Sequence, residues 1–519
     1  MSSLVQHLLG QPTDGVAVQP GATPTADTAT SFGDVADVSA QLAHALYERR
    51  GVEPGDRIGL LLEPGAAFIH ALTAVWRARA AALVLTPLHP AKERARLLDD
   101  AGARLVITSP KFAAVAADGA SATPVHVFAS AASGTASLDG HALPPPPRAR
   151  ALLPEADDLA LLVYTSGTTS RPKGVLLHHH HLEAQCDAIA EAWQLRSDDV
   201  LVHALPLHHV HGLVIALLSV LRVGGSAIML PSFDAHAVLA ACTRGGVLMA
   251  VPTMYARLLD VLETLAPDAR AAASATLTGL RLCTSGSAGL PVSIGERWSG
   301  FAGRYPVERF GMTELGVALS NRLHGERVPG SVGWPLPGVR IRIVDDAGVE
   351  ADEGELQVAG PTVFEGYWRR PDETAEAFVS VEGVRWFRTG DTVRKQHDGG
   401  VRMLGRTSVD ILKSAGYKLS ALAIEEALRR HPDVRDAAVV GVPDETYGQV
   451  VAAAVMPRAN ASPSPDALIT FLRGELAPYQ LPRIIRVVDD VPRNAMGKVI
   501  KPALADELTA FCRCPDDDS

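Results

Sequence analysis

One polar segment of the chain, Tyr164 to Gly174, gathers groups that bind phosphate. It reads YTSGTTSRPKG and follows an apolar run, Leu159 to Val163, that predicts a buried strand. Hydroxyls in the segment can donate hydrogen bonds, glycines let backbone N–H groups approach an anion, and Lys173 adds positive charge. The pattern is not that of a P-loop, because the lysine precedes the second glycine. The segment still predicts a site for a polyphosphate.

Further along the chain lie two carboxylates and a lysine of the kinds that a nucleotide-dependent reaction uses. Glu314 ends the segment RFGMTE, Asp391 ends WFRTGD, and Lys498 ends PRNAMGK. A carboxylate can accept two hydrogen bonds at once, which suits Asp391 to a pair of hydroxyls. Taken singly, Asp391 could form an Asx turn and Lys498 could be a solvated cation. Their occurrence together, in this order, argues against coincidence.

In this order the segments resemble the signature motifs of the adenylate-forming superfamily, which includes acyl-CoA synthetases, luciferases and the adenylation domains of peptide synthetases. The motifs run from Tyr164 to Lys498, and the resemblance extends over most of the chain. It implies an enzyme, an ATP-dependent acid–CoA ligase that forms an acyl-adenylate and then a CoA thioester. The cofactors that it implies are ATP, Mg²⁺ and coenzyme A, and the substrate is a small carboxylic acid.

The resemblance also implies roles for single residues. Thr313 would contact the α-phosphate, Glu314 would hold Mg²⁺, and Lys498 would be the lysine of the adenylation step. Asp391 would bind both ribose hydroxyls, with Arg406 as a second ribose contact. The implied catalytic residues are Lys498, Thr313, Glu314 and Lys173. The implied ATP- and AMP-binding residues are Thr165, Ser166, Gly167, Thr168, Thr169, Lys173, Ser287, Phe310, Gly311, Met312, Thr313, Asp391 and Arg406.

A hinge motif is implied where the chain reads GRTSVDILKSAGYK, starting at Gly405. In the family a small C-terminal domain rotates about this hinge after adenylation, so that the lysine leaves and a new face meets the thiol of CoA. Two half-reactions at one site need such a movement. The implied hinge and CoA residues are Asp410, Lys413, Gly416, Tyr417 and Lys418.

The residues that would surround the acid come from three segments of the chain. They are His209, Val210, Ser285, Arg309 and Val317. Short sequence segments, including HVHGLV and PGSVG, resemble those of malonyl-CoA synthetases more than those of other branches of the superfamily. A guanidinium at Arg309 could form a bidentate pair with the second, distal carboxylate of malonate. The alternative, in which Arg309 forms a salt bridge that supports its own loop, stays open.

Three positions depart from the relatives. Phe310 stands where the family has a tyrosine that stacks on adenine, so stacking is kept and a hydroxyl is lost. Ser232 replaces a basic residue of malonyl-CoA synthetases, and Val317 replaces a methionine. A missing cation would lower the affinity for a dianion, and a smaller side chain could admit methylmalonate.

Other functions stay open at this point. The main alternative is a different short-chain or aryl acyl-CoA synthetase. A stand-alone amino-acid adenylation enzyme is less favoured, because no aspartate lies near His209 and Val210 to pair an ammonium group. The presence of Lys173 and Lys498 speaks against a catalytically silent nucleotide-binding protein. The histidine runs at 178–181 and 203–211 could bind a metal, although no cysteine or acidic residue within them completes a ligand set.

Composition excludes several classes of protein. The chain has 519 residues and a net charge of −10, which argues against a protein that coats nucleic acid or anionic lipid. The 5 cysteines are scattered, which favours a reducing compartment over a disulfide framework. No apolar run reaches the roughly 20 residues of a membrane span. No targeting signal is recognised, so a cytoplasmic location is expected. The oligomeric state is not predicted.

The elements that must position these residues alternate between helices and apolar strands. Val35 to Arg49 has helical spacing, whereas Gly55 to Leu62 and Ala82 to Leu85 are strand-like. This alternation predicts an α/β fold, with a large N-terminal domain of two doubly wound α/β subdomains plus a small β-rich subdomain. A small, mobile α+β lid domain would follow. The expected limits are 1–405 for the AMP-binding domain, with subdomains at about 1–150, 151–325 and 326–405, and 406–519 for the lid.

Overall fold

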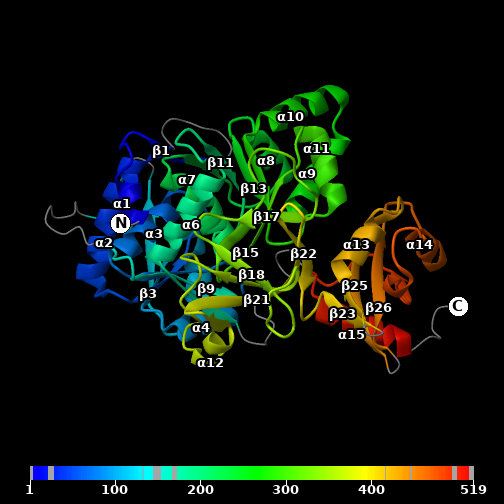
Figure 1. Cartoon of the computed structure of the whole chain (residues 1–519). Helices are drawn as coiled ribbons and strands as arrows, with labels where there is room; N and C mark the ends of the chain where they lie inside the picture. Colours follow the sequence, from blue (N-terminus) through cyan, green and yellow to red (C-terminus); the bar gives the residue numbers. More distant parts are fainter. Residues whose placement is uncertain are drawn as a thin grey trace.

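Two large β-sheets hold the strands that precede the predicted hinge in this computed structural model (Figure 1). The structure describes residues 4–20, 29–131, 134–143, 153–165, 172–414, 417–444, 447–493 and 499–513. Helices and strands alternate along most of the large N-terminal part, and a smaller α+β unit follows it. The predicted α/β class, with a large first domain and a small second one, is confirmed.

The first sheet has eight strands in the order β10-β9-β4-β3-β5-β6-β7-β8. Its central pairs are parallel, and β10 pairs antiparallel with β9. Successive side chains face opposite sides, so Leu60 lies in the main core and Leu61 in a second core on the other face. Both faces are therefore buried, as parallel sheets require. The strands are β3 (Arg57–Leu61), β4 (Ala81–Val84), β5 (Leu105–Thr108), β6 (Val125–Ser130), β7 (Ala136–Leu138), β8 (His141–Ala142), β9 (Leu159–Thr165) and β10 (Lys173–His178).

The second sheet has fourteen strands in the order β18-β19-β21-β22-β17-β16-β15-β14-β13-β11-β12-β1-β2, with β20 beside β21. The pairs from β1 to β15 are parallel, and the pairs from β15 to β18 are antiparallel. The strands are β1 (Val16–Pro20), β2 (Thr30–Ser31), β11 (Val200–His203), β12 (Ser226–Met229), β13 (Val247–Ala250), β14 (Leu282–Ser285), β15 (Val307–Met312), β16 (Gly316–Ser320), β17 (Ser331–Pro335), β18 (Arg340–Val344), β19 (Glu353–Ala359), β20 (Phe378–Val381), β21 (Val384–Lys395) and β22 (Val401–Arg406).

Helices cover these sheets, and α6 packs against strands of both, since it contacts β9, β10 and β16. Local signals set the helix ends. Helix α2 starts with a capping box between Ser31 and Asp34 and ends at Gly51, whose φ of 60° is left-handed. The helices are α1 (Leu4–Leu9), α2 (Phe32–Arg50), α3 (Ala66–Arg77), α4 (Ala91–Ala101), α5 (Ala113–Asp118), α6 (His179–Ala192), α7 (Ser219–Arg222), α8 (Ala235–Ala241), α9 (Pro252–Thr264), α10 (Pro267–Gly279), α11 (Val292–Ala302) and α12 (Pro371–Glu376), with the 3-10 helix η2 (Pro110–Phe112) and the π-helix η3 (His211–Leu218).

A smaller unit follows β22 and lies at one side of the molecule, drawn orange to red in Figure 1. It has two cores of its own, one on each face of a three-stranded sheet, with Val439 in one and Val440 in the other. Its elements are β23 (Ile411–Ser414), β24 (Tyr417–Ser420), α13 (Ala421–Arg429), β25 (Val434–Asp444), β26 (Gly448–Pro457), α14 (Pro465–Leu472), η4 (Pro478–Gln480), β27 (Ile484–Val487) and α15 (Lys501–Arg513).

Strands pair across the subdomain limits expected from the sequence, and those limits stay predictions. Strands β1 and β2 precede residue 150 but join the second sheet, whereas β9 and β10 follow it and join the first. The β-rich segment after residue 326 continues the second sheet, because β17 pairs with β16. Hydrogen bonding between strand edges, which local sequence does not reveal, decides this membership.

The most apolar stretch of the chain is part of the core. Leu213 to Leu218 form most of the π-helix η3, and every residue of that helix is buried. Within the described ranges, no helix combines the length and the apolar character needed to cross a membrane.

Candidate active site

Strands β9 and β10 bring the two ends of the predicted phosphate-binding segment together. Thr165 and Lys173 are register partners, and Thr165 Oγ1 lies 3.5 Å from the carbonyl oxygen of Lys173. The pairing holds Lys173 at the edge of the first sheet. The predicted residues Ser166, Gly167, Thr168 and Thr169 lie outside the described residues, as do Gly416 and Lys498.

Lys173 approaches a tyrosine that the sequence analysis does not single out. Its Nζ lies 5.2 Å from the centre of the Tyr367 ring, within cation–π range. The Tyr367 hydroxyl donates a hydrogen bond to Glu314 Oε1 at 2.9 Å. Tyr367 thus links the phosphate-binding segment to the predicted Mg²⁺ ligand. No motif points to it, because it comes 53 residues after its partner.

Glu314 lies in the turn between β15 and β16 and is 7% exposed. Burial raises the pKa of its carboxyl, while the hydrogen bond from Tyr367 and the charges of Arg406 and Lys173 lower it. Proteins bind Mg²⁺ through one or two carboxylates together with phosphate oxygens. A single carboxylate beside a predicted phosphate site therefore fits this ion.

The turn that carries Thr313 and Glu314 depends on a close approach of two strands. Phe310, Gly311, Met312 and Thr313 lead into it and are partly buried. A Cβ on Gly311 would lie 1.9 Å from the carbonyl oxygen of Gly316, so a side chain there would push the strands apart. The predicted site residues from Phe310 to Glu314 are therefore held together, in and just before one turn.

Asp391 and Arg406 face each other across β21 and β22. Arg406 Nη1 lies 3.1 Å from Asp391 Oδ2, and it also donates to the carbonyl oxygen of Thr389. Asp391 is 8% exposed. The structure thus brings the two predicted ribose-binding residues into direct contact.

Arg309 is buried on β15 and is 4% exposed. Its Nε and Nη2 atoms have no hydrogen-bond partner among the described residues. Burial lowers the pKa of its guanidinium to about 10, with no carboxylate acting against that effect. A Cβ on Gly286 would lie 2.2 Å from Arg309 Nε, so glycine is what leaves room for the side chain. A salt bridge from Arg309 to its own loop is the alternative. Within the described ranges, no carboxylate partner for such a salt bridge is seen.

Other buried polar atoms lie near Arg309. Ser285 is 1% exposed, and its Oγ has no hydrogen-bond partner within the described part of the chain. His211 Nδ1 lies 3.1 Å from Ser287 Oγ, whereas His211 Nε2 is unpartnered among the same residues. Burial and the charge of Arg309 hold the pKa of His211 well below its usual value. The unpartnered atoms of Arg309, Ser285 and His211 could therefore hydrogen-bond to a polar ligand.

His209 and Val210 line a small hollow against β4 and β9. The His208 and His209 rings lie 4.1 Å apart. Burial lowers the pKa of His209 to about 4, so that the ring is neutral near pH 7. Of the predicted acyl-pocket residues, these two line this mostly apolar hollow, and Arg309 is the one with a cationic side chain.

Gln185 is a further residue that sequence patterns miss. Its Oε1 accepts a hydrogen bond from the backbone N–H of Val317 at 2.7 Å, and its Nε2 has no partner in the described part of the chain. Gly316 has φ of 63°, and a Cβ there would lie 1.6 Å from Gln185 Oε1. Helix α6 thereby fixes the backbone of Val317, the predicted pocket residue.

Asp410 anchors the turn that follows β22. Its Oδ2 accepts a hydrogen bond from the Arg406 N–H at 2.9 Å. Gly405 has φ of 128°, and a Cβ there would lie 2.4 Å from the Cβ of Asp410. Glycine at this position permits the left-handed backbone and the close contact with Asp410.

The hairpin β23–β24 carries the remaining predicted hinge residues. Lys413 and Lys418 are register partners, and both are exposed. Lys418 Nζ lies 2.5 Å from Asp346 Oδ2, in the turn between β18 and β19. Tyr417 stacks on Tyr479 with ring centres 4.4 Å apart. The hairpin thus contacts both the large sheet and the rest of the small unit.

Two residues of the histidine runs, His181 and His203, hydrogen-bond to the backbone. His181 Nδ1 accepts the backbone N–H of His178 at 3.0 Å, which closes the first turn of α6. His203 Nε2 lies 2.9 Å from the carbonyl oxygen of Gly212. Within the described ranges, no three or more His, Cys, Asp or Glu residues form a group that could hold a metal ion.

Two family models match the chain, "AMP-binding enzyme" over residues 7–368 and "AMP-binding enzyme C-terminal domain" over residues 423–498. The chain belongs to the AMP-binding enzyme family. The mitochondrial malonate–CoA ligase ACSF3 of Bos taurus is 39% identical to this AMP-binding enzyme over 507 residues, which cover 91% of this chain and 85% of that protein.

Two solved structures share the fold of this AMP-binding enzyme. ATP-bound MatB of Rhodopseudomonas palustris has a TM-score of 0.87 at 33% identity and covers 98% of this chain and 99% of its own. A malonyl-CoA ligase in a ternary product complex with methylmalonyl-CoA and AMP has a TM-score of 0.65 at 36% identity, with 93% and 98% covered. The predicted enzyme class, an AMP-forming acid–CoA ligase of the adenylate-forming superfamily, is confirmed.

Proposed function

We propose that this AMP-binding enzyme is an ATP-dependent malonate–CoA ligase that also admits methylmalonate. The observation that carries the proposal is the buried guanidinium of Arg309, with two donor atoms unpartnered among the described residues. A buried cation without a partner is costly, and a ligand carboxylate would remove that cost. The malonate–CoA ligase of Bos taurus among the relatives supports the same substrate.

In the first half-reaction, an oxygen of one malonate carboxylate would attack the α-phosphorus of ATP. The bond from that phosphorus to the bridging oxygen would break, and pyrophosphate would leave. Lys173 would offset charge on the phosphates, and Asp391 with Arg406 would hold the ribose. Glu314 would hold Mg²⁺, which neutralises phosphate charge when bound. Arg309 would pair the second carboxylate and so orient the first.

In the second half-reaction, the sulfur of CoA would attack the acyl carbon of the adenylate. The bond from that carbon to the phosphate oxygen would break, AMP would leave with the electron pair, and the thiol proton would pass to solvent. A rotation at Asp410 would present Tyr417 and Lys418 for this step. The TM-score is higher with the ATP-bound structure than with the product complex, 0.87 against 0.65, although the product complex is the more identical in sequence. This supports an adenylation-like placement of the small unit here.

The valine at position 317 supports a substituted malonate. Val317 is fully buried, and Gln185 holds its backbone. Since valine is shorter than the methionine found in malonyl-CoA synthetases, the pocket would gain room for a methyl group beside the dicarboxylate.

The test measures CoA thioester formation with malonate, methylmalonate, succinate, acetate, propionate and benzoate. The wild type is expected to prefer malonate and methylmalonate. Arg309→Met should raise the KM for malonate on the order of 100-fold, because it removes one partner of a buried charge pair. Arg304→Met is the matched control, since Arg304 is an exposed arginine of the same region.

A wild type that uses acetate, propionate or benzoate faster than malonate would refute the role of Arg309. That result would favour the alternative of another short-chain or aryl acyl-CoA synthetase. Equal loss in Arg309→Met and Arg304→Met would refute it as well.

The cytoplasm is our proposal for the compartment of this enzyme. The relative from Bos taurus is named as mitochondrial, so that the two assignments differ. Subcellular fractionation of the native protein tests the proposal, and enrichment with a mitochondrial marker would overturn it.

A further inference from the structure

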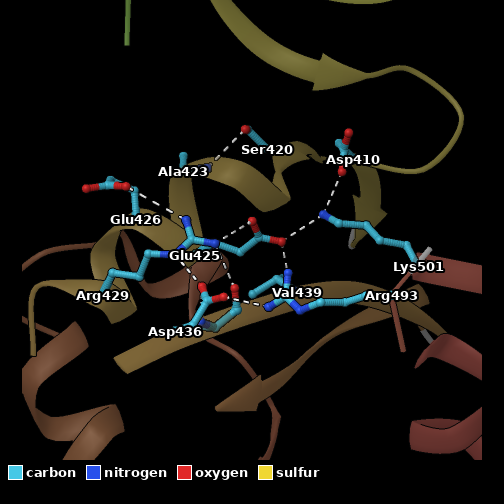
Figure 2. A network of polar contacts seen from close by, with 11 residues as sticks. Asp410, Ser420, Ala423, Glu425, Glu426, Arg429, Asp436, Val439, Arg493 and Lys501 are labelled. Atoms are coloured by element: carbon cyan, nitrogen blue, oxygen red, sulfur yellow. Dashed lines mark hydrogen bonds and ion pairs between the residues drawn. The ribbon is translucent and has the colours of Figure 1, made fainter. Parts of the chain in front are cut away.

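A network of charged side chains lies in the small unit (Figure 2). It includes Arg493 and Lys501, which precede and follow residues 494–498 in the sequence. Lys501 is the first residue of α15 and follows the predicted adenylation lysine, Lys498, by three positions. Lys501 Nζ lies 2.5 Å from Asp410 Oδ1 and 2.8 Å from Glu425 Oε1. The three side chains are only 11%, 13% and 5% exposed, respectively. The two half-reactions described above assign no role to Lys501.

Glu425 connects this ion pair to a second one. Glu425 Oε1 also accepts the Val439 N–H at 2.9 Å, and Glu425 Oε2 lies 3.4 Å from Arg429 Nη2. Arg429 Nε donates to Asp436 Oδ1 at 2.8 Å, and Arg493 Nη2 donates to Asp436 Oδ2 at 2.7 Å. The network therefore reaches Arg493 (Figure 2), which directly precedes residues 494–498 in the sequence.

Backbone contacts also join the residues just before positions 494–498 to those just after them. Arg493 and Val499 form an isolated antiparallel bridge. The Ile500 N–H donates to the carbonyl oxygen of Pro492 at 2.8 Å. The residues before and after 494–498 are thus held to each other by the backbone and to α13 and β25 by ion pairs.

Asp410 is the point at which the network reaches the hinge. One oxygen of its carboxylate lies against Lys501, and the other accepts the Arg406 N–H. Arg406 in turn pairs with Asp391. A series of contacts therefore runs from the predicted ribose-binding pair, through the hinge, to the chain that follows Lys498.

We propose that Lys501 is a positioning residue for acyl-adenylate formation, because its pairs with Asp410 and Glu425 fix the chain beside Lys498 relative to the hinge. This rests on the proposed function, in which Lys498 serves the first half-reaction. A compact ammonium with three donors suits a site between two carboxylates. The second half-reaction, for which Lys498 has left the site, does not need the arrangement.

The experiment measures the two half-reactions separately, as acid-dependent pyrophosphate release and as conversion of a prepared acyl-adenylate to the CoA thioester. Lys501→Ala should slow the first on the order of 100-fold, the effect of a misplaced catalytic group, and the second less than about threefold. Lys501→Arg should recover most of the loss. Arg458→Ala should match the wild type, because Arg458 is an exposed cation that donates to Pro432 outside the network. Equal slowing of both half-reactions, or none, would overturn the proposal.

A second readout needs no activity. Hydrogen–deuterium exchange of the peptide 490–500 should be faster in Lys501→Ala than in the wild type, Lys501→Arg or Arg458→Ala. Unchanged exchange would overturn the proposal by itself. If the wild type released no pyrophosphate with any acid, the proposed function would fail, and exchange alone would decide whether Lys501 holds this part of the chain.

Discussion

The hydroxyl of Tyr367 donates a hydrogen bond to the buried carboxylate of Glu314 at 2.9 Å. The same tyrosine ring lies 5.2 Å from Lys173 Nζ. One residue therefore contacts both the predicted Mg²⁺ ligand and the last cation of the phosphate-binding segment. Tyr367 orients Glu314 and helps to keep it ionised, because a hydrogen bond to the charged form of a carboxyl lowers its pKa.

Tyr367→Phe should shift the pH dependence of pyrophosphate release. Burial already raises the pKa of Glu314, and loss of the hydroxyl removes one of the effects that lower it. More enzyme would then hold a protonated Glu314 at a given pH, so the acidic limb of the rate profile should move to higher pH. The measurement is the profile at saturating Mg²⁺, with Tyr479→Phe, an exposed tyrosine of the small unit, as control. An unmoved limb would show that Tyr367 does not act on Glu314.

Arg309→Met should stabilise the protein without substrate. The wild-type guanidinium is buried, and two of its donors are unpartnered among the described residues. Replacing a buried charge by an apolar side chain of similar length is expected to add about 1–3 kcal/mol to the free energy of unfolding. Thermal unfolding checks this, and malonate should raise the Tm of the wild type but not that of the variant. A variant with a lower Tm would contradict the assignment.

We predict that the buried His179 makes the folded protein less stable in acid. Burial lowers the pKa of His179 from its usual 6.5 to about 4. The unfolded chain then binds the proton more readily, so the contribution is complete above pH 6.5 and is lost as the pH falls towards 4. The lowered pKa of His179 corresponds to about 3 kcal/mol of stability.

His179→Phe should therefore flatten the fall of Tm between pH 6.5 and 4. Both ring nitrogens of His179 lack partners among the described residues, and its ring packs edge-on against Trp76 at 5.3 Å, so that a phenyl ring can replace it. The neighbouring His180→Phe serves as control, because the His180 side chain is 37% exposed. Identical slopes for both variants would argue against burial as the cause.

The contribution of Glu308 to stability changes with pH in the opposite direction to that of His179. Burial raises the pKa of its carboxyl from 4.5 to about 7, and the carboxyl accepts the Gly330 N–H at 2.9 Å. The folded state keeps the proton longer than the unfolded chain, so this contribution is full below pH 4.5 and is lost as the pH rises through 7. Glu308→Gln keeps the volume without a titration. Its Tm should exceed that of the wild type by more at pH 8 than at pH 6, and a constant difference would contradict the prediction.

Local sequence was sufficient for the elements and for much of the chemistry. The run from Leu159 to Val163 is apolar, and it forms most of strand β9, which is buried from Ala160 to Leu162. The helix expected from Val35 to Arg49 is α2, since its apolar spacing and caps lie within one segment. Side-chain periodicity and capping depend on neighbours in the sequence, which is why they can be read from it.

The partners of the site residues required the tertiary structure. Gln185 contacts Val317 across 132 residues, and Tyr367 reaches Glu314 across 53. Sheet membership also crosses the expected subdomain limits, with β9 and β10 joining the first sheet. These contacts arise when strands and helices far apart in the chain pack together, and no local pattern specifies them.

The sequence by itself determined the enzyme class and the order of its motifs, and it led to the expectation that Arg309 pairs a second carboxylate. Only the tertiary structure decided that this guanidinium is buried beside Gly286 with donors unpartnered among the described residues. It alone also placed Lys501 between Asp410 and Glu425. The physical reason is that burial and charge pairing depend on every element packed around a side chain, whereas the type and spacing of residues belong to the chain alone.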